Sequence, residues 1–127
     1  PGPTLGYRIE SNGGSVAYLP DHEPALGATD FPESPAWTSG YDLADGVDVL
    51  LHDFQYTSEE YLSRQGWGHS SMRHTIRFAA HVGAGKLVTF HHDPEHDDAL
   101  LDELHARAQA RSDIEVIPGR TELSVAV

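Results

Sequence analysis

The chain has 127 residues, a length that supports one domain with a hydrophobic core of its own. Its apolar content of 39% is ordinary for a globular protein and excludes a wholly disordered chain. Eight basic residues against 20 acidic ones give a net charge of −12, which disfavours sequence-independent binding to nucleic acids because their backbones are also negative.

The first half of the chain predicts a hairpin, a long connection and a buried strand. Residues 5–18 alternate apolar with small or polar positions around an Asn-Gly-Gly turn, which is the pattern of a β-hairpin. Residues 22–46 are rich in Pro, Gly, Asp and Ser and predict an irregular connection, which at this length is usually functional or disordered. Residues 47–53 are mostly apolar and predict a strand buried on both faces.

The second half predicts alternating helices and strands. Helices are expected over 58–65 and within 70–84, each with Ser or Thr at its N-cap, and a second buried strand over 86–92. Asp93 is expected to cap a helix that begins at Pro94, since proline is favoured at the first helical position.

That last helix is expected to run to Ala108, followed by a strand over 114–117 and a final short strand formed by "ELSVAV". Strands and helices that alternate in this way indicate a single α/β domain over residues 1–127.

The lack of cysteine excludes disulfides and thiolate metal sites from this sequence and fits a reducing cytoplasm, where we expect the protein to act. We expect no membrane partner, because no apolar run approaches the roughly 20 residues of a membrane helix. Any metal would be held by His and carboxylate groups, which favours zinc, manganese or iron.

Polar side chains recur at the carboxyl ends of three predicted strands. Asp21 follows the hairpin, His52 and Asp53 end the strand expected over 47–53, and His91 with His92 ends the strand expected over 86–92. Ligand sites of α/β sheets assemble at this edge, so we expect the three groups to meet there.

Each group also has a simpler explanation. Asp21 could be a turn acid, and His52 with Asp53 could be a strand end followed by a capping acid. His69, in the glycine-flanked "GWGHSS", could be an exposed loop residue. The acids within 93–98 suit a helix N-terminus and are assigned to capping. Four more histidines are expected on helix faces: His74, His81, His96 and His105.

Four motifs, "VAYLPDHE", "VDVLLHDFQY", "GWGHSS" and "KLVTFHHDP", together resemble a known family in their order and approximate spacing. The chain resembles the C-terminal half of the metallo-β-lactamase fold hydrolases, in the branch that contains RNase Z and cyclic phosphodiesterases. The resemblance implies an αββα sandwich, with residues 1–127 forming one half as a mixed sheet with helices packed on it.

The resemblance also implies roles. Asp21 corresponds to the carboxylate that bridges two metal ions, and His92 to the terminal histidine on one of them. Asp53 corresponds to an acid that orients a catalytic histidine, and His69 to that histidine, which would protonate the departing oxygen. The implied cofactors are two Zn²⁺, Mn²⁺ or Fe²⁺ ions in the complete protein, and the implied substrate is a small phosphodiester or ester. Contact of a metal with two further histidines stays open: His52 and His91.

The chain departs from the family in ways that matter for function. The H-x-H-x-D-H signature is absent, as is the histidine that precedes the bridging Asp, so we expect a fragment whose missing N-terminal half supplies the other ligands. Cutting the sandwich in two would expose the apolar sheet face that packed against the missing half. We therefore expect an oligomer, or a chain that stays associated with its second half. Where RNase Z has Ser-Arg after its last histidine this chain has Asp93 and Pro94, which with the net charge makes tRNA an unlikely substrate.

Two other functions are compatible with the sequence. The chain could be a non-catalytic binding or regulatory module that retains the fold without the chemistry. A flavodoxin-like domain would need a phosphate-binding loop after the first strand, but "SNGGSV" is better explained as a hairpin turn.

Overall fold

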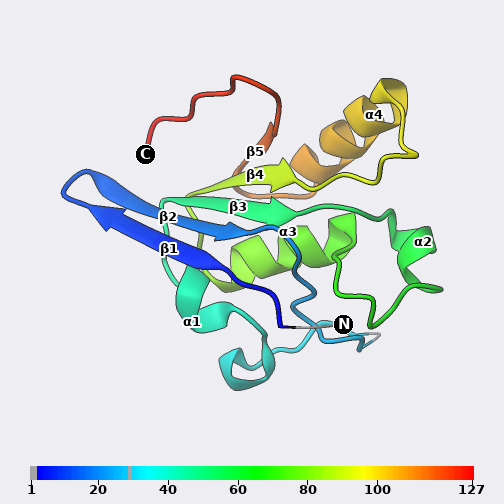
Figure 1. Ribbon diagram of the computed structural model, residues 1–127, viewed down its shortest axis with the longest axis horizontal. Coiled ribbons are helices and arrows are strands. Elements are labelled where there is room, and N and C mark those ends of the chain that lie inside the picture. The colour runs from blue at the N-terminus through cyan, green and yellow to red at the C-terminus, as the bar shows by residue number, and fades with distance from the viewer. Residues whose placement is uncertain (1–2, 29) are drawn as a thin grey trace.

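The computed structural model describes residues 3–28 and 30–127, and its centre is one five-stranded mixed sheet (Figure 1). The strands lie side by side in chain order, with β1 and β2 antiparallel and every later pair parallel. Their bounds are β1 Tyr7–Ser11, β2 Gly14–Leu19, β3 Val49–Asp53, β4 Lys86–Phe90 and β5 Glu115–Pro118. Because β2 to β5 are parallel, the residues that follow them share one edge of the sheet.

The helices connect the strands, and three of them cover one face of the sheet. Their bounds are η1 Pro35–Trp37, α1 Tyr41–Ala44, α2 Ser58–Tyr61, α3 Met72–His81 and α4 Asp98–Gln109. The helix α3 starts with Ser71 as its N-cap, whose side chain accepts a hydrogen bond from the amide of His74. Gly83, with φ of +66°, follows the end of this helix in a backbone conformation that favours glycine.

The hydrophobic core lies between this face and the helices α1, α3 and α4. Alternate residues of each strand point toward the helices, as the pleat of a strand requires. Side chains from four strands, β2 to β5, and three helices contribute to this core, including Ala17, Ala44, Leu50, Phe78, Leu87 and Leu104. The strand ends that carry the polar groups are therefore anchored to a packed layer.

The opposite face of the sheet is covered only in part. Val49, Leu51 and Val88 of this face line a hollow of about 670 Å³, whose other side is formed by the C-terminal segment through Leu123 and Val125. This segment lies across the sheet without joining it as a strand, and its backbone accepts a hydrogen bond from Lys86 Nζ at 3.0 Å.

Three expectations from the sequence are corrected by the structure. Helix α4 begins at Asp98 with Asp97 as its N-cap, rather than at Pro94. The carboxylate of Asp93 accepts from the amide of Glu95 and its carbonyl from that of His96, which closes a separate turn and delays the helix.

The second correction concerns "ELSVAV", which forms no strand because a turn at 120–123 directs it onto the sheet face instead of along β5. The third concerns the connection over 22–46, which contains η1 and α1. No helix within the described part of the chain is long and apolar enough to cross a membrane.

Candidate functional site

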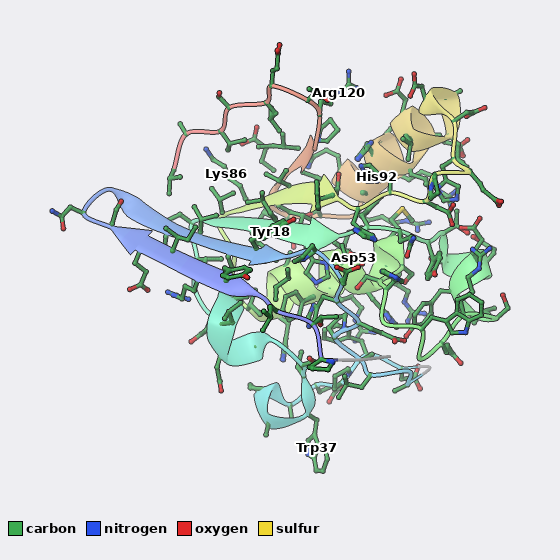
Figure 2. The ribbon with its side chains drawn as sticks, viewed as in Figure 1. Tyr18, Trp37, Asp53, Lys86, His92 and Arg120 are labelled. Carbon is green, nitrogen blue, oxygen red and sulfur yellow. The ribbon has the colours of Figure 1, made fainter. Side chains whose placement is uncertain are left out.

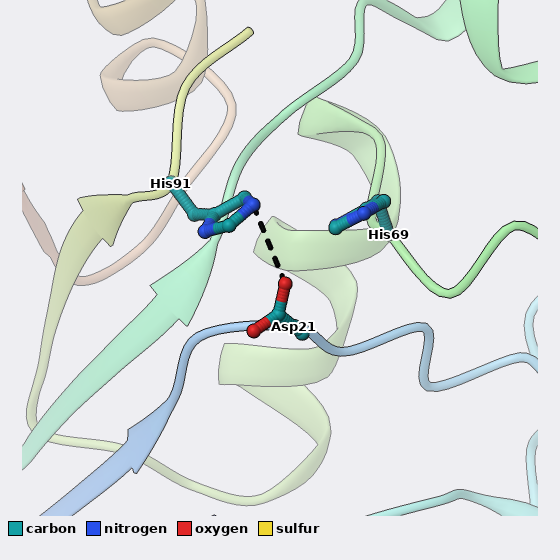
Figure 3. A group of neighbouring side chains, drawn as sticks. All are labelled: Asp21, His69 and His91. Atoms are coloured by element: carbon teal, nitrogen blue, oxygen red, sulfur yellow. Dashed lines mark ion pairs between the residues drawn. The ribbon is translucent and has the colours of Figure 1, made fainter. Parts of the chain in front are cut away.

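Three side chains that could hold a metal ion meet at the carboxyl edge of the sheet (Figure 3). Asp21 follows β2, His91 follows β4, and His69 stands in the loop before α3. One donor atom from each lies within 4.8 Å of the others, and His91 Nε2 is 3.4 Å from Asp21 Oδ1. The rings of His69 and His91 stack at a centroid distance of 5.0 Å. Residues distant in sequence are thus gathered into one polar cluster.

Asp53 is the buried anchor of this cluster, at the end of β3 (Figure 2). Its carboxylate accepts a hydrogen bond from His69 Nδ1 at 2.7 Å and others from the amides of Gln55 and Ser70 at 3.1 and 2.9 Å. The amide of His22 approaches the same carboxylate at 3.4 Å. Because Nδ1 of His69 is engaged, only Nε2 is available to a metal or a substrate.

The contact between Asp53 and His69 controls the protonation of the histidine. The hydrogen bond to Asp53 raises the pKa of His69, and the negative charges of Asp53 and Asp21 act in the same direction. Burial raises the pKa of Asp53, while the hydrogen bonds that it accepts lower it. Burial has the larger effect on Asp53, and the hydrogen bonds from its several donors oppose it by favouring the anion, which in turn stabilises the protonated form of His69.

A buried pair of hydrogen-bonded histidines joins the segment after β2 to the end of β3. His52 Nδ1 donates to the carbonyl of Asp53 at 2.8 Å, so its Nε2 must accept from His22 Nδ1, which is 2.7 Å away. Burial lowers the pKa of His22 to about 4, so both rings of this pair are neutral near pH 7. His52, at the end of a strand, therefore positions the backbone of the site and does not reach the cluster.

Glu23 fixes the loop that carries His69, a role that the sequence did not indicate. Its buried carboxylate accepts hydrogen bonds from Tyr61 Oη at 2.7 Å and from the amides of Gly66 and Gly68 at 2.8 and 3.0 Å. Both glycines have positive φ, which a residue with a side chain adopts only with strain. The available signal was Glu23 itself, which ends the run "PDHE" directly after a strand. An acid that is buried at such a place needs hydrogen-bond donors from a neighbouring loop.

The two adjacent histidines after β4 point in different directions. His91 has φ of +57°, an uncommon conformation for a residue other than glycine, and its ring faces Asp21. His92 lies beside α4 (Figure 2), with its ring 5.9 Å from that of Phe54 and 5.2 Å from that of His105. His92, to which the resemblance gave the metal-binding role, is thus outside the cluster, and His91 stands next to Asp21 instead.

The donor set of the cluster fits a divalent cation. A carboxylate oxygen and imidazole nitrogens suit zinc, manganese or iron. Two donors at about 2.0–2.1 Å from a tetrahedral zinc ion are about 3.4 Å apart, and His91 Nε2 and Asp21 Oδ1 have that separation. The pairing of His69 with Asp53 also resembles the carboxylate support that metal-binding or acid–base histidines need.

Comparison with protein families gives a match over most of the chain. The model of the beta-lactamase superfamily domain matches residues 1–92, which include Asp21, Asp53, His69 and both histidines that follow β4.

Curated relatives share this region at low identity. The chain is 28% identical over 119 residues to ribonuclease BN of Citrobacter koseri, covering 87% of this chain and 39% of that protein. It is 31% identical over 81 residues to ribonuclease BN of Escherichia coli K12, covering 64% of this chain and 27% of that protein. The chain therefore spans well under half the length of these relatives.

Solved structures show the same fold. The metallo-beta-lactamase fold protein YhfI of Bacillus subtilis superposes with a TM-score of 0.64 at 17% identity, over 91% of this chain and 41% of its own. Human tRNase Z, short form, superposes with a TM-score of 0.63 at 18% identity, over 96% of this chain and 37% of its own. A diphosphatase of the PhnP family gives 0.52 at 14% identity, over 92% and 44%. The chain belongs to the beta-lactamase superfamily and has the metallo-β-lactamase fold of its RNase Z-like branch.

Proposed function

We propose that the complete protein is a metal-dependent phosphodiesterase, to which this chain contributes Asp21 and His91 as metal ligands and His69 as proton donor. The observation that carries the proposal is the convergence of these three side chains at one edge of the sheet. Membership of the chain in the beta-lactamase superfamily supports hydrolytic chemistry, and relatives named as ribonucleases act on phosphodiester bonds.

The residues of this chain would divide the work as follows. Two divalent ions, zinc or else manganese or iron, would supply the Lewis acidity that activates water and neutralises phosphoryl oxygens. Asp53 holds Nδ1 of His69, which would leave the Nε2 proton available to a substrate. The hydrogen bond to Asp53 raises the pKa of His69, which favours the protonated ring, and His69 would donate this proton to the departing oxygen.

The remaining ligands would come from a segment outside this sequence. A catalytic zinc site uses about three protein ligands, and Asp21 with His91 provides one carboxylate and one imidazole. We propose that the missing segment packs against the partly covered sheet face over the 670 Å³ hollow. Sedimentation of this chain alone at micromolar concentration would then show an oligomer, and a stable monomer would contradict the proposal.

We further propose a small phosphodiester as the substrate, in preference to RNA. The net charge of −12 repels a polyanion, and the bound ions would offset that repulsion only at the site itself. Hydrolysis of a short diester should therefore exceed that of tRNA at physiological salt, and efficient tRNA cleavage would overturn this choice.

The direct test is hydrolysis of bis(p-nitrophenyl) phosphate by the complete protein, after chelation and after addition of Zn²⁺ or Mn²⁺. Activity should depend on the added metal and should be lost in Asp21→Ala and His69→Ala. Matched controls are Asp30→Ala, an exposed acid, and His81→Ala, at the far end of α3, which should keep most of the activity.

Metal content gives a second test. This chain alone should hold less than one ion per molecule, because its two proposed ligands leave the coordination incomplete. A tightly bound pair of ions in this chain alone would contradict the proposed division of the site. A metal-loaded complete protein that binds phosphodiesters and never hydrolyses them would favour a non-catalytic binding module.

A further inference from the structure

A pocket of about 360 Å³ opens beside the proposed catalytic groups. Its lining includes Thr4, Asp21, Leu26, Ser39, Trp67 and His69. The volume falls within the range of sites that bind small molecules. Because the pocket reaches both Asp21 and His69, a group held there touches the place where a phosphodiester would react.

Trp67 is the largest side chain of this pocket, and 62% of its surface is exposed. Exposure of one tryptophan is ordinary, but exposed apolar side chains that gather at a pocket indicate a binding surface. Leu26, 71% exposed, lines the same pocket. The two loops that carry them are in close contact, since a Cβ at Gly27 would lie 3.2 Å from the backbone of Gly66.

The backbone on both sides of Trp67 is fixed. The amides of Gly66 and Gly68 donate to the two carboxylate oxygens of Glu23, and the amide of Trp67 itself donates to the carbonyl of Arg64 at 3.1 Å. An apolar surface with so little freedom loses little conformational entropy when a ligand packs on it. The backbone that carries the indole is therefore held in place before a ligand enters the pocket.

The charges of the pocket restrict what that ligand can be. Among the residues that the structure describes, the lining has the acids Asp21 and Glu23 and neither lysine nor arginine. Apart from His69, which the proposed reaction uses for the leaving oxygen, this lining offers no cation to a second phosphate or a carboxylate. The hydroxyl groups of Thr4 and Ser39 provide polar contacts suited to the edge of a neutral ring.

We propose that this pocket binds the leaving group of the substrate, and that this group is neutral, flat and aromatic, of the nucleoside type, stacked on Trp67. The inference rests on the proposed function, because His69 would protonate the leaving oxygen and the part of the substrate attached to that oxygen must lie on the same side as His69. Trp67, two residues before His69, is then the residue that selects the leaving group.

Binding is tested first without turnover. In the complete protein with Trp37→Phe, the fluorescence of Trp67 is taken as the difference from the variant that also carries Trp67→Phe, and it is followed during titration with adenosine or with ribose. Saturable quenching by adenosine and none by ribose is the expected result. Equal responses to both, or no response to either, would overturn the proposal.

Kinetics give the second arm. Trp67→Ala should raise KM for bis(p-nitrophenyl) phosphate about fivefold to tenfold with kcat little changed, and Trp67→Phe should restore most of the loss. The matched control is Trp37→Ala, which removes a 78% exposed tryptophan located in η1 and directed away from Asp53 (Figure 2).

The two arms separate the two proposals. Unchanged KM in Trp67→Ala with normal hydrolysis would overturn the stacking role and leave the phosphodiesterase in place. Quenching of Trp67 by adenosine in a protein that hydrolyses no phosphodiester would support the ring-binding pocket and overturn the proposed function.

Discussion

Two pairs of histidine rings flank the end of β4, and their surroundings differ in almost every respect. His69 and His91 stack at 5.0 Å beside two carboxylates, and their side chains are partly open to solvent. His92 and His105 meet edge to face at 5.2 Å, next to the aromatic ring of Phe54. We name them the open pair and the packed pair.

Environment rather than residue type separates the two pairs. In the open pair, the hydrogen bond that His69 donates to Asp53 raises the pKa of His69. In the packed pair, burial lowers the pKa of both His92 and His105. The same type of side chain is thus favoured in its protonated form on one side of the strand end, and in its neutral form within packed rings on the other.

The largest effect is expected from a substitution that breaks the open pair. In the complete protein His91→Ala should reduce metal-dependent hydrolysis at least about a thousandfold, because it removes a proposed metal ligand. The matched variant His92→Ala should stay within about threefold of the unchanged protein. Steady-state rates with elemental analysis of bound metal check both, and the reverse order would restore the metal-binding role to His92.

Next in size is the loss of the carboxylate that orients His69. Asp53→Asn should lower kcat about a hundredfold or more, since the amide no longer stabilises the protonated imidazole. Bound metal should change little, which separates this variant from His91→Ala. A metal content that falls together with the rate would mean that His69 is a ligand rather than the proton donor.

A smaller effect is expected when the packed pair is broken. His92→Ala should lower the free energy of unfolding by about 1–2 kcal/mol through lost aromatic packing. His91→Ala should change it less, since the His91 side chain is 32% exposed. Urea denaturation of both variants measures the difference, and equal losses would show that the two regions are packed alike.

The smallest effect concerns pH. Burial lowers the pKa of His105 below the ordinary 6.5, so the unfolded chain binds a proton more readily than the folded protein. The free energy of unfolding should therefore be fully retained above about pH 6.5 and fall as the pH decreases below it.

His105→Phe tests this dependence, because it keeps a ring stacked on Phe54 and removes the titration. The variant should lose about 1 kcal/mol at pH 7.5 with the hydrogen bond to Thr89, and its stability should vary less between pH 7.5 and 5. Urea denaturation across this pH range measures the free energy of unfolding of both proteins. An identical pH dependence in the two would contradict the assignment of this dependence to His105.

Much of the fold and part of the site could be predicted from local patterns. The hairpin and Ser71 at the start of α3 follow from turn and capping chemistry that acts within a few residues. The start of α4 could not be decided in this way, since Asp93 and Asp97 are both good capping residues and only the turn closed by Asp93 selects between them. The path of "ELSVAV" depended on the apolar face that it covers.

The amino-acid sequence by itself determined which polar groups end the strands. The order of the apolar runs fixes the positions of Asp21, of Asp53 and of the two adjacent histidines that follow β4. Only the tertiary structure decided which of those histidines faces the acids, since the positive φ of His91 redirects the chain between two identical neighbours. It also decided that Glu23 supports the loop of His69, a contact that joins residues more than 40 positions apart. Local chemistry sets the elements, whereas a site that draws on several strand ends depends on how the whole sheet brings them together.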